Sequence, residues 1–249
     1  MLTISNISKR YGDDLALDHF TLTIKPAQLT VLIGPSGCGK STLLKLVMGL
    51  EEPDSGEIGW HKDIALLSSS LQQRRKIGYV IQEGGLFPHL TARKNVTLVA
   101  DYLGWSSGKK RKRVEELAEL VQLDFGLLQR YPLQLSGGQR QRISLMRALM
   151  LDPDILLLDE PLGALDPMVR ADLQQDLKSI FQKLSKTVIL VTHDMGEAIF
   201  FADRIVLMRE GKIVQQGTAG EMIDRPVDPF VTRFIQAQQS PLHRLGEKR

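Results

Sequence analysis

Residues 34–42 have the composition of a phosphate-binding loop. They read GPSGCGKST and match the pattern G-x-x-x-x-G-K-[ST]. Glycines let the backbone turn tightly and aim successive N–H groups at one anion. Lys40 would neutralise the β- and γ-phosphates, and the Ser41 hydroxyl would complete a Mg²⁺ shell. A glycine-rich turn could match by chance, but the apolar run 30–33 before it and the helix-forming run 42–47 after it favour a strand–loop–helix unit.

Two acids follow the apolar run 155–158, which reads ILLL. A strand that is apolar on both faces belongs inside a covered parallel sheet. Asp159 at its carboxyl end can hold Mg²⁺, directly or through water. Glu160 can polarise the water that attacks a γ-phosphate, a general-base role. The structural alternative is that the two acids only mark the exit of a strand to solvent.

Polar residues also end two further apolar runs, 77–81 and 188–191. Ligands of open α/β sheets gather at the carboxyl ends of strands. Gln82 is therefore placed to touch the metal or the attacking water, and His193 to contact the γ-phosphate. A lone Gln or His at a strand end is more often structural; the position of these two beside the same predicted site favours the functional interpretation.

A second predicted anion site lies at residues 135–139, which read LSGGQ and precede an apolar-periodic helix. Ser136 has the position of a helix cap, and the glycines allow close approach to the free N–H groups of the first turn. Near the N-terminus, Tyr11 lies in a turn before the phosphate loop. It either packs that turn or stacks on a purine ring.

The composition of the chain limits the classes of protein that it can be. Its 249 residues allow one large domain or two small ones, and its 43% hydrophobic and 24% charged content is ordinary for a soluble globular protein. A net charge of +3 is too small to argue for nucleic-acid binding, and a single cysteine excludes an internal disulfide. We find no signal peptide pattern at the N-terminus and no apolar run of about 18 residues, so we expect a peripheral subunit if the protein acts at a membrane.

Hydrophobic periodicity predicts the elements that position these residues. Period-two alternation predicts strands within the first thirty residues, and the sequence pattern from 83 to 151 predicts mostly helices. Residues 68–76 are polar and predict a surface loop or a short helix. The basic run 109–113 could meet lipid or nucleic acid, but a solvated helix face is the favoured interpretation. A hairpin over 205–214 and a last short helix over 230–235 precede a polar end.

Together these pieces resemble the ATP-binding subunit of an ABC transporter, over nearly the whole chain and in the motif order of that family. The resemblance assigns 34–42 as Walker A, Gln82 as the Q-loop, 135–139 as the signature and 155–160 as Walker B. It also assigns residues 163–166 as the D-loop, His193 as the H-loop and Tyr11 as the adenine-stacking aromatic.

The resemblance implies a set of site residues with separate roles. The catalytic residues would be Glu160, His193 and Gln82. The metal ligands would be Ser41, Gln82 and Asp159, and the cofactors would be ATP and Mg²⁺. The nucleotide-binding residues would be Tyr11, Gly34, Pro35, Ser36, Gly37, Cys38, Gly39, Lys40, Ser41, Thr42, Ser136, Gly137, Gly138, Gln139 and Asp166.

The family's fold and mechanism add further expectations. The fold is an α/β P-loop NTPase: a RecA-like core with an N-terminal antiparallel β part and an inserted helical subdomain at about 83–152. A single domain would cover 1–236, with a tail over 237–249. Each ATP would lie between Walker A of one subunit and the signature of another, so we expect a dimer of identical or paralogous cassettes. Its partners would be transmembrane permease subunits and, indirectly, a solute-binding protein, at the cytoplasmic face of the inner membrane.

Loop sequences suggest a subfamily. Residues 78–91 and 103–105 resemble bacterial importers of osmoprotectants such as glycine betaine, choline or carnitine. Many of those ATPases carry C-terminal CBS domains that these 249 residues lack, and Gly163 stands where the D-loop commonly has Ser. The alternatives are an importer ATPase for another polar solute, of the amino-acid type, and a soluble ABC ATPase of DNA repair or translation. The latter usually has coiled-coil insertions or two cassettes, and we expect no nucleic-acid partner.

Overall fold

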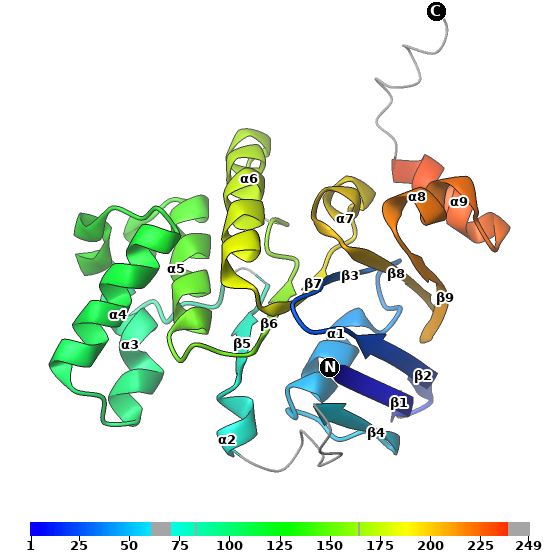
Figure 1. Cartoon of the computed structure of the whole chain (residues 1–249), viewed down its shortest axis with the longest axis horizontal. Coiled ribbons are helices and arrows are strands. Elements are labelled where there is room, and N and C mark those ends of the chain that lie inside the picture. The colour runs from blue at the N-terminus through cyan, green and yellow to red at the C-terminus, as the bar shows by residue number, and fades with distance from the viewer. Residues whose placement is uncertain (61–70, 83, 164, 239–249) are drawn as a thin grey trace, which may run out of the picture.

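The strands form two sheets in the computed structural model, which describes residues 1–60, 71–82, 84–163 and 165–238 (Figure 1). The larger sheet has six strands in the order β5-β6-β7-β3-β8-β9, and all neighbours are parallel except the β8–β9 hairpin. Its strands are β3 Leu29–Ile33, β5 Ile77–Val80, β6 Ile155–Asp159, β7 Thr187–Val191, β8 Arg204–Arg209 and β9 Lys212–Gly217. Because β5, β6, β7 and β3 are parallel neighbours, their carboxyl ends lie at the same edge of the sheet. The strand order differs from the sequence order, so these ends come from distant parts of the chain.

The smaller sheet is antiparallel, with the order β2-β1-β4. Its strands are β1 Leu2–Tyr11, β2 Asp14–Ile24 and β4 Ser55–Trp60. One face of β1 and β2 is buried, as the alternation of Leu2, Ile4, Leu22 and Ile24 predicts. This is the expected N-terminal antiparallel part.

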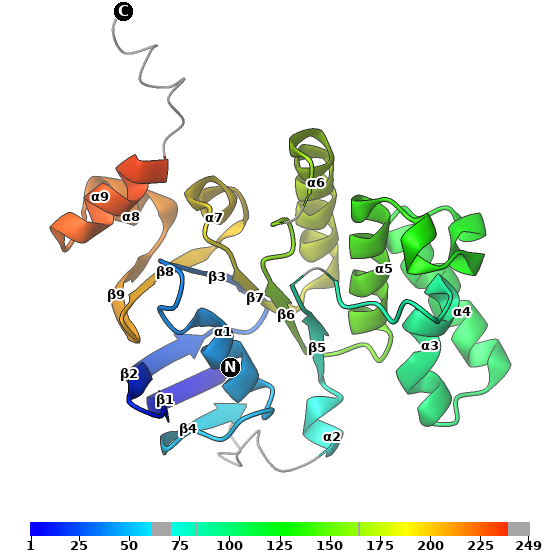
Figure 2. The same ribbon diagram turned by 180° about the vertical axis from the view of Figure 1, so that it is seen from behind.

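The helices between β5 and β6 form one group beside the sheet edge (Figures 1 and 2). This group contains α3 Ala92–Tyr102, α4 Ser107–Leu120, the 3₁₀ helices η1 Phe125–Gln129 and η2 Pro132–Gln134, and α5 Gly137–Leu149. The other helices are α1 Lys40–Val47, α2 Leu71–Arg74, α6 Pro167–Leu184, α7 Met195–Phe201, α8 Ala219–Asp224 and α9 Pro229–Gln238. Side-chain caps fix several helix starts: Thr91 Oγ1 accepts the N–H of Lys94, and Thr218 forms a capping box with Glu221.

The central strands are buried on both faces because each face has its own hydrophobic cluster. Leu156 and Leu158 of β6 belong to the cluster that includes α6, α7 and the helical group. Ile155 and Leu157 alternate with them and pack instead with α1 and the antiparallel sheet. The continuous apolar run of β6 is therefore a consequence of its coverage.

Two expectations about less regular segments can be compared with the structure. The polar stretch 68–76 contains the short helix α2, while residues 61–70 lie outside the described residues. Helix α9 ends at Gln238, two residues beyond the expected domain end at 236, and the Gln238 side chain accepts the N–H of Met195 at 2.5 Å. The remainder of the predicted tail, 239–249, is outside the described residues.

The basic run 109–113 is part of α4, and all of its side chains except that of Lys112 have a local partner among the described residues. The ammonium of Lys109 lies 3.7 Å from the Trp105 ring centre. The other contacts are Lys110 with Asp101, Arg111 with Glu115, and Arg113 with the Leu149 carbonyl and with Glu116 and Asp152. These pairs support the interpretation as a solvated helix face.

Candidate functional site

The phosphate-loop candidate joins β3 to α1, as the sequence predicts. Gly39 immediately precedes α1 at φ +104, and a Cβ there would lie 2.4 Å from the Ala16 carbonyl oxygen, so only glycine fits. The first N–H groups of α1 have no partner within the helix and face the loop. The Lys40 ammonium donates to the carbonyls of Gly34 at 2.8 Å and Pro35 at 2.9 Å. The loop therefore concentrates positive charge and free donors, which is what a phosphate chain requires.

Asp159 lies at the end of β6 and is almost completely buried. The Ser41 hydroxyl donates to its Oδ1 at 3.4 Å, and the Tyr79 hydroxyl donates to its Oδ2 at 3.4 Å. Burial raises the pKa of Asp159, while the hydrogen bond from Ser41 opposes this shift. Burial, and then the charge of Asp159, raise the pKa of Tyr79, so this phenol stays protonated and remains a donor.

Glu160 is placed between the two other predicted catalytic side chains. Its Oε2 accepts from Gln82 Nε2 at 3.4 Å, and its Oε1 lies 3.3 Å from His193 Nδ1. The backbone at Glu160 is left-handed, with φ +46, an arrangement that costs free energy for a residue other than glycine. Its N–H donates to the Val191 carbonyl at 2.9 Å, which ties this turn to the end of β7.

Hydrogen bonds of the neighbouring residues Thr192 and Asp194 fix the loop that carries His193. The Thr192 hydroxyl donates to Glu197 Oε2 at 2.6 Å, and both residues are buried. Asp194 caps α7 by accepting the N–H of Glu197 at 3.0 Å. Burial raises the pKa of Glu197. His193 itself is largely exposed, so its ring is free to meet a ligand.

The second anion site, at the start of α5, is preformed but separate. Ser136 Oγ accepts the N–H of Gln139 at 3.3 Å, and Gln139 Oε1 accepts the N–H of Ser136 at 2.9 Å. This capping box also gives Gln139 a structural role. Helix α5 contacts α3, α4, α6 and β5, whereas α1 contacts β2 and β6. Figures 1 and 2 show the same separation, so this chain does not bring its two anion sites together.

Two further predicted ligands have local partners. Tyr11 is exposed, and its hydroxyl donates to Glu51, which also pairs with Lys45 of α1 at 3.1 Å. The ring thus lies beside the helix that follows the phosphate loop. Asp166 caps α6 by accepting the N–H of Met168 at 3.0 Å, a structural role that the sequence interpretation did not include.

Comparison with known proteins identifies the family. A family model described as "ABC transporter" matches residues 17–163, more than half of the chain. This chain belongs to the ABC transporter family. The solved structure of dimeric MJ0796, a bacterial ABC transporter cassette, superposes with a TM-score of 0.77 at 34% identity and covers 88% of this chain and 99% of that one. The predicted family and the predicted P-loop NTPase fold are confirmed.

Curated relatives of this ABC cassette differ in solute. The choline transport ATP-binding protein OpuBA of Bacillus subtilis is 45% identical over 94% of this chain and 62% of its own length. The carnitine transport ATP-binding protein OpuCA of Listeria monocytogenes is 46% identical over 94% of this chain and 59% of its own length. The probable sulfate/thiosulfate import ATP-binding protein CysA of Chlorella vulgaris is 49% identical and matched over 98% of its length. The chain thus spans about three fifths of the choline and carnitine relatives.

The donor set of the cassette fits Mg²⁺ together with phosphate. No group of three or more His, Cys, Asp or Glu side chains that could hold a metal occurs among the described residues. Ser41 and Asp159 nevertheless place a hydroxyl and a carboxylate oxygen 3.4 Å apart beside the phosphate loop. Protein Mg²⁺ sites commonly use one or two carboxylates and take their other ligands from water and substrate phosphates. Such a site would take its remaining ligands from water and from nucleotide phosphates.

Arg147 of α5 holds the loop after Gln82, a role that sequence reasoning missed. Its guanidinium donates to the carbonyls of Gly84 at 2.8 Å and Gly85 at 2.7 Å, and Ser144 Oγ donates to Gly84 at 2.9 Å. Both glycines have positive φ, which turns their carbonyls toward α5. The adjacent glycines were a signal for this turn, but their partner lies about sixty residues away and cannot be found from spacing.

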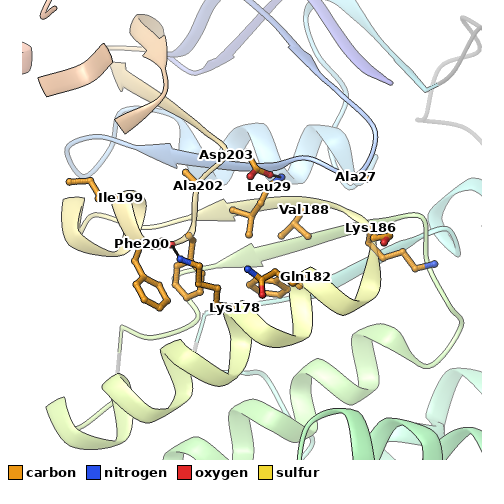
Figure 3. A pocket seen from close by; sticks show the side chains of 13 residues that line it. Ala27, Leu29, Lys178, Gln182, Lys186, Val188, Ile199, Phe200, Ala202 and Asp203 are labelled. Atoms are coloured by element: carbon orange, nitrogen blue, oxygen red, sulfur yellow. Dashed lines mark hydrogen bonds between the residues drawn. The ribbon is translucent and has the colours of Figure 1, made fainter. Parts of the chain in front are cut away.

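A pocket of about 400 Å³ lies elsewhere in the cassette (Figure 3). It is lined by the first residues of β3 and β7, the end of α6 and the end of α7, so it is at the opposite end of the strands from the phosphate loop. Lys178 donates to the Phe200 carbonyl at 2.7 Å, and Asp203 accepts from the N–H of Leu29 at 2.8 Å. Lys178 and Asp203 are thus committed to the fold, and we assign no ligand to this pocket.

No helix in the described ranges has both the length and the apolar character needed to cross a bilayer.

Proposed function

We propose that this cassette binds and hydrolyses ATP with Mg²⁺. The observation that carries the proposal is the position of Glu160, whose two carboxylate oxygens lie 3.4 Å from Gln82 Nε2 and 3.3 Å from His193 Nδ1. A carboxylate held in this way beside a phosphate loop can accept a proton from an attacking water. A solved structure of the MJ0796 cassette, which is 34% identical to this chain, is bound to ADP and Pi.

Each residue has a role that its position supports. The α1 start and Lys40 would bind the phosphates, and Ser41, Asp159 and Gln82 would hold Mg²⁺. Bound Mg²⁺ supplies charge neutralisation at the β- and γ-phosphates. Glu160 would act as the general base, and His193 would contact the γ-phosphate. Tyr11 would stack on the adenine.

We propose further that a second cassette completes the site. Walker A and the signature do not meet within one chain, and Ser136 with the two glycines after it forms a ready anion site at the start of α5. An ATP held by α1 of one cassette can be closed by α5 of another. The MJ0796 cassette is dimeric in its solved structure, and cbiO1 of Clostridium perfringens, which is 28% identical, is described as part of the cbiONQ transporter complex.

The proposed biological role is to power a bacterial importer from the cytoplasmic face of the membrane through permease subunits and a solute-binding protein. Quaternary-amine osmoprotectants are the proposed solutes, supported by the choline, carnitine and glycine betaine relatives at 44–46% identity. A second candidate is sulfate or thiosulfate. It is favoured by the relative that is 49% identical and matched over 98% of its own length.

Phosphate release by purified protein with Mg²⁺ and ATP tests the enzymatic proposal. We expect Glu160→Gln to lower the turnover number by about 10²- to 10⁴-fold because the amide cannot accept the proton. Glu57→Gln, on an exposed part of β4, is the matched control and should keep wild-type turnover. Undiminished turnover in Glu160→Gln removes Glu160 from the base role.

Affinity purification tests the transport proposal. Tagged Glu160→Gln protein would be isolated from gently solubilised cells with ATP present, and its partners identified by mass spectrometry. A polytopic membrane protein with a solute-binding protein is the expected result, and the latter can be titrated with choline and with sulfate. Recovery of ribosomal or DNA-repair proteins would instead leave the ATPase chemistry in place and refute transport.

A further inference from the structure

Asp159 is a buried carboxylate at the proposed metal site, and each of its two oxygens accepts a hydrogen bond from a different hydroxyl. Ser41 contacts Oδ1 and Tyr79 contacts Oδ2, each at 3.4 Å. Ser41 is exposed at the start of α1 and is itself a proposed metal ligand. Tyr79 is a residue of β5, is packed against the hydrophobic cluster that contains α1, and is not a candidate ligand in the sequence interpretation.

The register of the sheet explains why Tyr79 reaches Asp159. Tyr79 of β5 lies directly beside Leu157 of β6 in parallel register. Residues two apart on a strand share a face, so Asp159 lies on the same face as Leu157, one step toward the carboxyl end. The Tyr79 ring packs against the hydrophobic cluster that also contains α1. Ring and carboxylate are therefore held by separate rigid elements.

We propose that Tyr79 is a positioning residue for the Mg²⁺ ion: its hydroxyl holds Oδ2 of Asp159 and thereby presents Oδ1 toward Ser41 and the metal. This inference rests on the proposed ATP and Mg²⁺ site. A carboxylate has two equivalent oxygens and rotates freely about its last torsion, so a single hydroxyl contact leaves either oxygen available. A hydroxyl donor fixed in the sheet binds one of the two oxygens and leaves the other available to the metal.

The sparse donor set increases the effect of this orientation. Groups that orient a metal ligand through a hydrogen bond influence metal affinity although they never touch the metal. The other proposed protein ligands, Ser41 and Gln82, are uncharged, so neither can replace the carboxylate oxygen if Asp159 turns. A change in Tyr79 should therefore appear in the Mg²⁺ requirement and not in nucleotide binding as such.

Equilibrium binding of a fluorescent ATP analogue, titrated with Mg²⁺ and repeated in EDTA, tests the proposal. Tyr79→Phe removes one oxygen atom and keeps the packed ring. We expect it to raise the Mg²⁺ concentration for half-maximal enhancement about tenfold, with unchanged binding in EDTA. Tyr102→Phe is the matched control, because Tyr102 is 82% exposed at the end of α3, and its Mg²⁺ curve should equal that of the wild type.

Several outcomes would overturn the inference. One is a Tyr79→Phe curve that coincides with the wild type or moves to lower Mg²⁺. Another is an equal loss of affinity with Mg²⁺ and in EDTA, because that result assigns Tyr79 to packing alone. Failure of wild-type protein to bind the analogue with Mg²⁺ is distinguishable from both, since it removes the proposed function itself and the inference with it.

Discussion

Replacement of Arg147 by lysine tests whether the loop after Gln82 is held by the guanidinium fork. The two Arg147 bonds, of 2.7 and 2.8 Å, go to adjacent carbonyls, and a lysine can keep the charge but reach only one of them. A hydrogen bond to a charged group contributes about 1.5–3 kcal/mol. Gly84 retains its Ser144 bond, and the Gly85 carbonyl is only partly buried, so we expect a loss near the lower end.

Thermal unfolding of the nucleotide-free protein measures this loss. A destabilisation of about 2 kcal/mol corresponds to a fall in Tm of roughly 4–8 °C in a chain of this size. Arg111→Lys is the matched control: Arg111 is 78% exposed and pairs with Glu115 of its own helix, so the Tm of this variant should not change. Equal Tm values for the two variants would refute the idea that the two Arg147 hydrogen bonds stabilise this loop. Turnover should also fall in Arg147→Lys, because the clamped loop follows Gln82.

Three other perturbations have expected outcomes. Lys40→Ala should weaken ATP binding roughly 10- to 100-fold in calorimetric titration, since one charge-assisted contact is lost, and unchanged affinity would argue against the phosphate loop. Glu197→Gln should flatten the dependence of Tm on pH between about 4.5 and neutrality: burial raises the pKa of Glu197 above 4.5, so its contribution to stability is present at low pH and is lost as pH rises through the folded pKa. Alkylation of Cys38, which is 4% exposed, should be slow and should slow further with ATP; equal labelling would contradict its placement in the loop.

The sequence predicted the core of the site because the motifs are local. Residues 34–42 combine glycines, lysine and hydroxyls in one turn between a strand and a helix, and the structure has β3 and α1 at those places. Gln82, Glu160 and His193 follow strands that parallel pairing brings to one edge, so strand ends alone placed them together. Capping residues such as Ser136 and Thr218 were predictable for the same reason, since a cap acts within four residues.

The supporting contacts could not be predicted because they depend on register and on distant packing. Tyr79 reaches Asp159, eighty residues later in the chain, only because β5 pairs with β6. Arg147 meets Gly84 only since α5 packs beside the loop after β5. The structural role of Asp166 as a cap was hidden by its position in a family motif.

The left-handed backbone at Glu160 implies a trade-off between thermal stability and catalytic turnover in this cassette. A non-glycine residue at φ +46 costs on the order of 1 kcal/mol, and asparagine tolerates that region better than glutamate. The residue with the lowest conformational free energy in this turn is thus not the one that can accept a proton from water. Selection for thermal stability alone should favour Glu160→Asn and give a more stable but inactive protein. Screens for stabilised variants of this chain therefore need an activity assay that covers this position.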